Sequence, residues 1–473
     1  MICFISIQGI AEKTIPSNEV IATKHISKYL KPDVHNKLPG KGKEALAQYF
    51  RQQFSTRYFY DWQLNNQKYQ SYNTLYSNAS MHRNRALDHM SVFEGNTTWQ
   101  LPMKDKNGSE VTSYAFRHLA RQHKMVDVAL EYYSSGKNQA YLTYFVNQVT
   151  SLNQAVQDNT YERIVGGNGV FESFRSGYRI LNWLEIHSLF LGEEGYSDEH
   201  QLNTIAALLQ HGQHLYENNA HFHPGNHQTK GMSSLALLGI LFQDFVGTDL
   251  WYRRAMDRLL EHLENEINDD GFQFERTIHY HKSDIANYYY VYQLAKKNKI
   301  SIDPVWENKL NALFLTLVKI AYPDGTAPVL SDDTENPWAE KNDIDGALTI
   351  GYLLFENPEY GYFAKNKVEA KMYWFIGQKQ IDMLTDIKVQ RPQYSSLSFP
   401  NTHYYIMRQG YSKGDRMMVI SAGKDSIKPD HQHGDMLGIQ DSAFGEVVLP
   451  TYQARYSLPD YAFFNNSMVH NVA

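Results

Sequence analysis

Helical periodicity decides the fold, and it is clearest in residues 252–263, which read YRRAMDRLLEHL. Counted from Tyr252, apolar side chains recur there at i, i+3, i+4, i+7, i+8 and i+11, the spacing of one face of an amphipathic helix. The stretch 306–321 repeats this pattern. Weaker versions of it cover 110–134, 138–157, 173–191, 199–217, 230–246, 283–297 and 343–355. Because these helices follow one another through short connections, we predict a large domain of paired helices.

The period changes after about residue 390, where short runs of alternating residues replace the helical pattern. Strands are predicted at 403–408 and 416–420, on either side of a turn, and again at 438–439 and 446–449. The sequence therefore predicts a mainly α chain with a C-terminal β part. We place the helical domain at 12–388 and the first part of an antiparallel β domain at 389–473.

Residues 1–11 read MICFISIQGIA, a short apolar run with small residues at Gly9 and Ala11. This pattern is typical of the end of a signal peptide, and a buried first strand is the alternative. The signal-peptide interpretation predicts a periplasmic or secreted protein that loses Cys3, its one cysteine.

Composition excludes several classes of function. The 473 residues carry 45 Lys+Arg and 51 Asp+Glu, a net charge of −6, which argues against a nucleic-acid partner. No apolar stretch approaches the ~20 residues of a transmembrane helix. One cysteine excludes a disulfide framework and a thiolate zinc site. The 20 His and 34 Tyr suit acid–base chemistry and stacking on sugars. Nothing in the sequence predicts the oligomeric state.

Two polar segments stand directly before predicted helices. Asn226 and His227 precede an apolar helix, whose N-terminus offers free N–H groups and positive potential to an anion. A simple N-cap role for Asn226 is the alternative. Tyr280 lies close to Arg276, His279 and His281, and positive neighbours would lower its pKa and suit it as a general base. A hydrogen-bonded loop between helices is the alternative there.

Three further groups of residues could carry chemistry. His431 and His433 stand at i and i+2 on a predicted strand, so both would point the same way toward a metal or a substrate. His-x-His also arises by chance in a chain with 20 His. Arg175 and Arg179 share a helix face and either bind sugar carboxylates or form solvated surface. Ser331-Asp332-Asp333 supplies either catalytic acids or a turn.

Taken in order, these segments resemble the heparinase II/III-like superfamily of polysaccharide lyases, which includes heparinase III and exolytic alginate lyases. The motifs that carry the resemblance are Arg179-Ile-Leu-Asn-Trp183, Asn226-His227, Asp270-Gly…Tyr280-His281, Pro323-Asp-Gly…Ser331-Asp332, Tyr404-Tyr-Ile-Met-Arg408, His431-x-His433-x-Asp435 and His470-Asn471. The resemblance implies an (α/α) toroid followed by an antiparallel β-sandwich, here truncated, with the active site between them. It also implies β-elimination on an anionic uronate polysaccharide, either alginate or a heparan-sulfate-like glycosaminoglycan.

By this resemblance, Asn226 and His227 hold the uronate carboxylate and stabilise the enolate-like intermediate. Tyr280 removes the proton beside the carboxylate and protonates the leaving oxygen, while His431 assists as base or carboxylate binder. The expected substrate contacts are Arg175, Arg179, Glu275 and Tyr456. The cations available for a sulfated substrate are Arg175, Lys230, Arg276 and Lys282.

The resemblance implies no cofactor for the chemistry, although many relatives bind a structural zinc through a His, an Asp and a second His. His433 and His470 match the two histidines, whereas 447–451 contains no acid where the Asp is expected. Two other functions stay open. They are a glycoside hydrolase on an α/α toroid, with Glu275 and Asp332 as its carboxylates, and a non-catalytic polysaccharide-binding protein.

Overall fold

The computed structural model describes residues 15, 20–165, 167–333, 336, 338–423, 431, 433–454 and 458–472. The predicted signal-peptide remnant at 1–11 and the predicted substrate contact Tyr456 lie outside these residues. Of the helices within the described ranges, none combines the length and the apolar character needed to cross a membrane.

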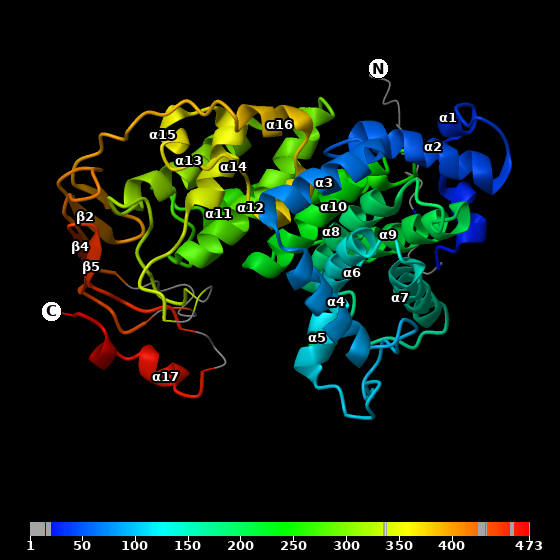
Figure 1. Ribbon diagram of the computed structural model, residues 1–473, viewed down its shortest axis with the longest axis horizontal. Helices are drawn as coiled ribbons and strands as arrows, with labels where there is room; N and C mark the ends of the chain where they lie inside the picture. The colour runs from blue at the N-terminus through cyan, green and yellow to red at the C-terminus, as the bar shows by residue number, and fades with distance from the viewer. Residues whose placement is uncertain are drawn as a thin grey trace, which may run out of the picture.

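Helices follow one another through most of the chain (Figure 1). The helical elements are η1 (Thr23–Tyr29), α1 (Pro32–His35), α2 (Gly42–Arg57), η2 (Trp62–Leu64), α3 (Asn65–Tyr76), α4 (Ala79–Val92), α5 (Ser113–Arg121), α6 (His123–Ser134), α7 (Gln139–Gln157), α8 (Ser173–Phe190), α9 (Asp198–Asn218), α10 (Asn226–Leu241), α11 (Thr248–Glu266), α12 (Ile278–Lys297), α13 (Pro304–Ile320), α14 (Asp345–Phe355), α15 (Pro358–Gly361), η3 (Ala370–Phe375) and α16 (Gln378–Met383). Helices are therefore present wherever the apolar period predicted them, with differences in where they begin and end.

The stretch predicted as one helix at 110–134 forms two helices, α5 and α6. Gln122 separates them with a left-handed φ of 60°, and its N–H bonds to the Leu119 carbonyl. Its buried side chain donates to the Leu119 carbonyl at 3.1 Å and to Gln148 at 3.0 Å. A left-handed residue costs about 1–2 kcal/mol without glycine, and these buried hydrogen bonds offset that cost. The break gives α6 an N-terminus of its own.

Two other helices begin earlier than predicted. α10 begins at Asn226 instead of 230, and α12 begins at Ile278 instead of 283. Both first turns are rich in polar residues, so they do not show the apolar period that marks the rest of each helix. The polar segments that the sequence placed before these helices are therefore their first turns.

α8, α10 and α12 run parallel, with their N-termini at the same end. Ser234 of α10 donates to the Gly177 carbonyl of α8 at 2.7 Å, and the earlier Gly231 of α10 packs against the earlier Ser173 of α8. The two helices therefore run in the same direction. α11 runs antiparallel to α10, because its last residue, Glu266, accepts from the N–H of Gly225 just before α10. α12 packs directly on α10, where Ser233 donates to the Asn287 carbonyl at 2.8 Å. Three positive helix ends thus lie at one end of the helical part.

The C-terminal part is a five-stranded antiparallel sheet with strand order β1-β2-β3-β4-β5. Its strands are β1 (Leu397–Phe399), β2 (Tyr404–Arg408), β3 (Met417–Ser421), β4 (Gly438–Ala443) and β5 (Glu446–Leu449), followed by α17 (Tyr461–Phe464) and η4 (Ser467–Val469). In β2 the side chains of Tyr404, Ile406 and Arg408 are buried, and those between them are exposed. The predicted fold class, mainly α with a C-terminal antiparallel β part, is confirmed.

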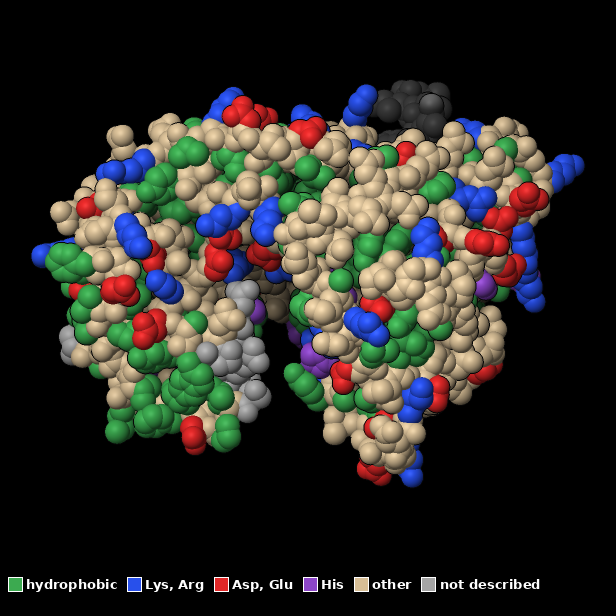
Figure 2. Space-filling model, in the orientation of Figure 1, with side chains coloured by type: hydrophobic (Ala, Val, Ile, Leu, Met, Phe, Trp, Pro, Cys, Tyr) green, Lys and Arg blue, Asp and Glu red, His purple; other side chains and the backbone are tan. Residues whose placement is uncertain are grey.

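The sheet packs against the helical part through buried polar contacts. Arg408 donates to the carbonyls of Lys319 at 3.0 Å and Ala321 at 2.6 Å, at the end of α13. The Tyr404 hydroxyl donates to the Arg276 carbonyl at 2.9 Å, two residues before α12. Figure 2 shows a deep cleft between the part that carries the sheet and the part that carries α4 and α5, with histidine side chains in its walls.

Candidate active site

Asn226 is the first residue of α10, and it does not cap the helix. The N-cap is Gly225, whose φ of 98° favours glycine. Asn226 is half-buried, and no group in the described part of the chain is hydrogen-bonded to its side-chain amide. The capping interpretation is therefore wrong. The amide is left free at the positive end of a 16-residue helix.

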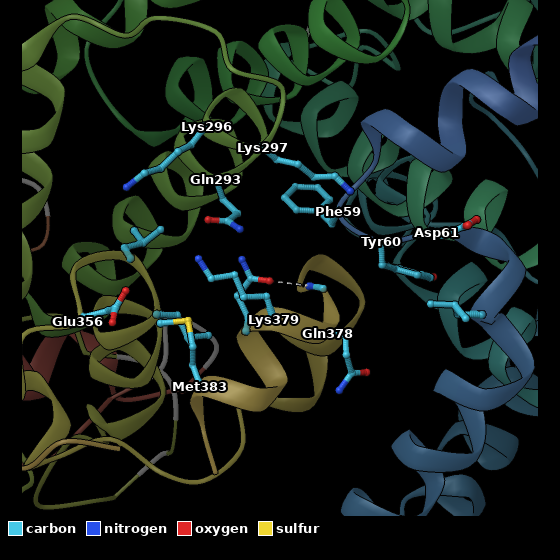
Figure 3. A pocket seen from close by; sticks show the side chains of 15 residues that line it. Phe59, Tyr60, Asp61, Gln293, Lys296, Lys297, Glu356, Gln378, Lys379 and Met383 are labelled. Atoms are coloured by element: carbon cyan, nitrogen blue, oxygen red, sulfur yellow. Dashed lines mark hydrogen bonds between the residues drawn. The ribbon is translucent and has the colours of Figure 1, made fainter. Parts of the chain in front are cut away.

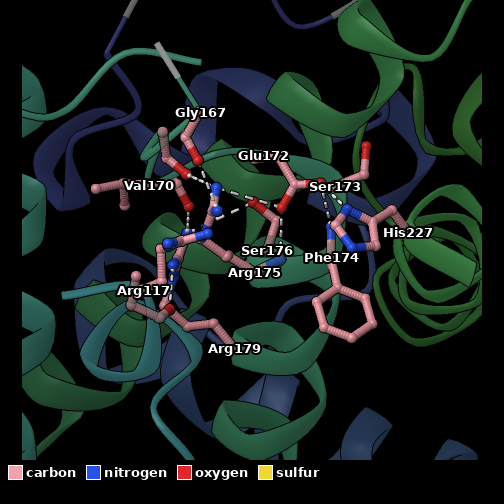
Figure 4. A network of polar contacts seen from close by, with 12 residues as sticks. Arg117, Gly167, Val170, Glu172, Ser173, Phe174, Arg175, Ser176, Arg179 and His227 are labelled. Atoms are coloured by element: carbon pink, nitrogen blue, oxygen red, sulfur yellow. Dashed lines mark hydrogen bonds and ion pairs between the residues drawn. The ribbon is translucent and has the colours of Figure 1, made fainter. Parts of the chain in front are cut away.

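His227 is held from one side only. Its Nδ1 donates to Glu172 Oε1 at 3.0 Å, and its ring stacks on Phe174 with ring centroids 4.5 Å apart (Figure 4). Burial acts to raise the pKa of Glu172, but the hydrogen bond from His227 and the N–H of Phe174 outweigh it, so the pKa is lowered. The His227 side chain remains 61% exposed, which leaves its Nε2 available to a ligand.

Tyr280 lies in the first turn of α12, whose position is fixed by two caps. Its N–H donates to the Thr277 hydroxyl at 3.0 Å, and the N–H of the preceding His279 donates to Asp333 Oδ1 at 2.7 Å. Asp333 Oδ2 also accepts from the Leu330 N–H at 2.8 Å. The loop after α13 therefore holds the turn that carries Tyr280.

Two of the three neighbours expected to lower the pKa of Tyr280, Arg276 and His281, have hydrogen-bond partners elsewhere. Arg276 donates to the carbonyl of Gly423 and to the Ser421 hydroxyl in the sheet part. His281 is buried against the Leu313 carbonyl, and burial lowers its pKa to about 4, so it is neutral at pH 7. The lowering of the Tyr280 pKa stays a prediction. Two rings lie beside Tyr280: that of the preceding His279, with ring centroids 5.1 Å apart, and that of His431, with ring centroids 4.5 Å apart.

Asp332 holds His431 and His433 together. His431 Nδ1 donates to Asp332 Oδ2 at 3.0 Å, and His433 Nε2 donates to Asp332 Oδ1 at 2.7 Å. Asp332 is 1% exposed. Burial acts to raise its pKa, but the hydrogen bonds from the two histidines hold it well below its ordinary value. The two histidines are not on a strand as predicted, because β4 begins only at Gly438 and His431 has a left-handed φ of 69°.

The histidines expected to bind zinc lie near each other but lack a complete ligand set. The rings of His433 and His470 are 5.1 Å apart, and three of their four ring nitrogens are buried without a hydrogen-bond partner in the described part of the chain. Across the described ranges, however, no group of three or more His, Cys, Asp or Glu could hold a metal ion. Asp332 already accepts from His433. These residues do not fit a three-ligand zinc site.

Three predicted substrate contacts, Arg175, Arg179 and Glu275, are buried, and Figure 4 shows the two arginines bound within the protein. Arg179 is fully buried and donates to the carbonyls of Ala120 and of Val170, the latter at 2.8 Å. Arg175 donates to the carbonyl of Gly169 at 3.1 Å, and Glu275 is only 2% exposed. Their positions do not support contact with a substrate. Both arginines instead hold the loop before α8 in place.

A hollow of about 510 Å³ lies at the C-terminal end of α12, where Lys296, Lys297 and Lys379 line it beside Tyr60 (Figure 3). None of the predicted site residues lines it. Lys296 is 16 residues beyond Tyr280, which places this pocket about 24 Å away along the helix. It is separate from the cluster at the helix N-termini.

A family model described as Heparinase II/III N-terminus matches residues 26–356. The chain belongs to this family. It is 21% identical over 211 residues to a heparin-sulfate lyase of Bacteroides thetaiotaomicron, covering 43% of this chain and 28% of that protein. It is also 21% identical over 251 residues to a heparin-sulfate lyase of Pedobacter heparinus, covering 52% of this chain and 34% of that protein.

Solved structures show the same fold. A heparinase III structure superposes with a TM-score of 0.66 at 16% identity, covering 98% of this chain and 70% of that chain. A mutant of the heparan sulfate lyase HepC from Pedobacter heparinus gives a TM-score of 0.64 at 18% identity, covering 90% and 64%. By sequence, the matched part of the chain spans about a third of the length of its lyase relatives.

Proposed function

We propose that this protein is a polysaccharide lyase that cleaves a glycosaminoglycan by β-elimination at a uronate. The observation that carries the proposal is the free Asn226 amide at the start of α10, beside a parallel helix whose first turn carries Tyr280. Membership of the Heparinase II/III N-terminus family supports it. The names of the two sequence relatives favour a glycosaminoglycan over alginate as substrate.

The first requirement of the reaction is to neutralise the uronate carboxylate. The C5 proton beside it is poorly acidic while the carboxylate keeps its full charge. The Asn226 amide donates to this carboxylate, and His227 donates from Nε2 in its imidazolium form, in which Nδ1 also donates to Glu172. Both stabilise the enolate-like intermediate, as fixed donors do for other developing oxyanions. The N-termini of α8, α10 and α12 add positive potential at the same end, which gives local attraction for a polyanion despite the net charge of −6.

The second requirement is a base and an acid on the scissile bond. Tyr280, as its phenolate, takes the C5 proton, the C4–O bond breaks as the C4=C5 double bond forms, and Tyr280 returns the proton to the leaving oxygen. His431 lies against the Tyr280 ring and assists as base, and its orientation is fixed by the Nδ1 hydrogen bond to Asp332. Asp332 acts here as a positioning residue, a role the sequence did not predict.

The test measures the unsaturated uronate product, which absorbs in the ultraviolet, on a panel of glycosaminoglycans and alginate. We expect Tyr280→Phe to lower kcat about 10²–10⁴-fold and Asn226→Ala about 10²–10³-fold. Tyr405→Phe, a matched change on the exposed face of β2, should keep parental activity. New reducing ends without ultraviolet absorbance would instead indicate a glycoside hydrolase. Folded protein that cleaves none of the polymers would contradict the proposal.

A further inference from the structure

Within the described part of the chain, Lys230 is a buried cation without an ion-pair partner. Of the four cations considered for a sulfated substrate, three donate to backbone carbonyls: Arg175 to Gly167 and Gly169, Arg276 to Gly423, and Lys282 to Asp343. Lys230 is only 5% exposed, and within the described residues no carboxylate or hydrogen-bond acceptor contacts its ammonium. The ammonium instead lies 4.5 Å from the centre of the Tyr178 ring.

Lys230 lies on the same helix face as Asn226. The two residues are four apart on α10, so Lys230 is about 6 Å further along the axis, deeper in the helical part. Asp284, four residues after Tyr280 on α12, is the carboxylate that interacts with Lys230 over a longer distance. Burial, together with Glu266 and Glu275, raises the pKa of Asp284 well above its ordinary value, so the charged form that would balance the lysine is disfavoured.

A second unpartnered cation, Arg121, lies at the end of α5. Its Nε is buried without a partner, and no other described residue accepts from its guanidinium. The guanidinium carbon lies 4.9 Å from the centre of the Phe174 ring, which is the ring that stacks on His227. Phe174 in turn contacts Tyr178, with ring centroids 4.8 Å apart. Arg121 and Lys230 are thus linked to the carboxylate site through two adjacent aromatic rings.

The surroundings of His123 show that positive charge accumulates here. This first residue of α6 packs on Tyr178 with ring centroids 4.5 Å apart. Burial, with the charges of Arg121, His118, Lys230 and Arg85, lowers its pKa to about 3. Burial likewise lowers the pKa of Lys230 to about 7. An anion placed between these cations would relieve their mutual repulsion, and the N-terminus of α6 adds its own positive end.

We propose that Arg121 and Lys230, which lie against the adjacent rings of Phe174 and Tyr178, form a second oxyanion subsite for a sulfate group on the sugar next to the uronate held by Asn226. This inference rests on the proposed lyase function and names the residues that select a sulfated over an unsulfated glycosaminoglycan. Arg121 supplies a planar pair of donors, Lys230 supplies a point charge, and the Tyr178 ring supplies a face for the sugar. The site is deeper than Asn226 and His227, so it recognises the substrate and takes no part in the bond changes.

The experiment compares sulfated heparan sulfate with the unsulfated polymer of the same sugars, using Lys230→Met and Arg121→Gln. We expect the ratio of kcat/KM for the sulfated polymer to that for the unsulfated polymer to fall about 10- to 100-fold in each variant. Lys68→Met is the matched control, because Lys68 is also buried over a tyrosine ring but donates to the Ile376 carbonyl. Its ratio should stay within about twofold of the parent. Urea unfolding of each variant checks that it is folded.

Binding separates this inference from the proposed function. The Kd of a sulfated and of an unsulfated tetrasaccharide is measured by calorimetry in the Tyr280→Phe background, with and without Lys230→Met or Arg121→Gln. Sulfate-dependent binding that both substitutions weaken supports the subsite, even if no polymer is cleaved and the lyase proposal fails. If the protein is an active lyase, but neither substitution changes the Kd values or the ratio of kcat/KM between sulfated and unsulfated polymer, the subsite alone is overturned. Equal losses on both saccharides overturn the assignment to sulfate, and absence of both binding and cleavage overturns both proposals.

Discussion

Asp332→Asn tests whether one buried carboxylate sets the geometry of the histidines beside Tyr280. Asp332 Oδ2 accepts from His431 Nδ1 at 3.0 Å, and Oδ1 accepts from His433 Nε2 at 2.7 Å. An asparagine has the same shape, but one of its two terminal atoms is a donor. A donor would then face a ring N–H, so one of the two histidines must lose its partner or rotate.

The magnitude follows from the hydrogen bond that is lost. A hydrogen bond to a charged group contributes about 1.5–3 kcal/mol, and about 1.4 kcal/mol corresponds to a tenfold change in rate. We therefore expect Asp332→Asn to lower kcat about 10- to 150-fold. KM should change less than about threefold, because Asn226 and His227 lie on a different element and still hold the carboxylate.

The assay is the steady-state rate of ultraviolet absorbance on the best polymer of the panel, with urea unfolding measured in parallel. Asp324→Asn is the matched control, since Asp324 lies in the same loop and pairs with Lys341 at 2.7 Å, away from the histidines. Its kcat should equal that of the parent. A folded Asp332→Asn protein with parental kcat would refute the role assigned to Asp332, as would a change confined to KM.

Three further changes test the interior of the helical part by urea unfolding. Burial next to Asp127 raises the pKa of Glu185 to about 8. The stabilising contribution of Glu185 is therefore complete below about pH 4.3 and is lost as the pH rises toward 8. Glu185→Gln should reduce this pH-dependent loss of unfolding free energy by at least about 1 kcal/mol, and an unchanged dependence of stability on pH would contradict the prediction. Gly177→Ala places a Cβ 2.7 Å from the Lys230 carbonyl oxygen, so we expect the variant to be about 1–3 kcal/mol less stable. Alanine in place of glycine usually stabilises a helix by about 1 kcal/mol, and a stabilisation of that size would contradict the close packing. Arg179→Met leaves buried carbonyls unpaired and should cost about 2–5 kcal/mol, whereas the same change at the exposed Arg253 should cost less than about 0.5 kcal/mol.

Elements with a strong local period could be predicted from the sequence. The apolar spacing around Leu259 and the alternation from Tyr404 to Arg408 reflect burial of one face of a helix or strand, so each is visible within about ten residues of chain. Element ends depend on other information. Gln122 breaks a helix through a buried hydrogen bond to Gln148, a residue 26 positions away, and no local pattern marks that contact.

The contacts among the site residues were even harder to predict from local sequence than the ends of the helices. Asn226, His227 and Tyr280 stood out because each precedes an apolar helix, and the structure places all three in the first turns of α10 and α12. Asp332 and His431 are 99 positions apart, so their pairing appears only in three dimensions. Arg175 and Arg179 were predicted to bind a ligand because their spacing in the sequence places them on one face of a helix. That spacing does not show that backbone carbonyls already accept hydrogen bonds from both side chains.

The candidate site is built from two separate stretches of chain, which the packing of the sheet on the helical part brings together. Asn226, His227 and Tyr280 belong to the helices, whereas His431 follows β3 and reaches the site only because Arg408 and Tyr404 fasten the sheet to the ends of α13 and the start of α12. In the proposed mechanism, capture of the sugar and turnover are therefore separable properties. A substitution that weakens the contacts of Arg408 or Tyr404, away from the sugar-binding residues, would leave a protein that still binds its polysaccharide but no longer cleaves it, and so acts as a lectin.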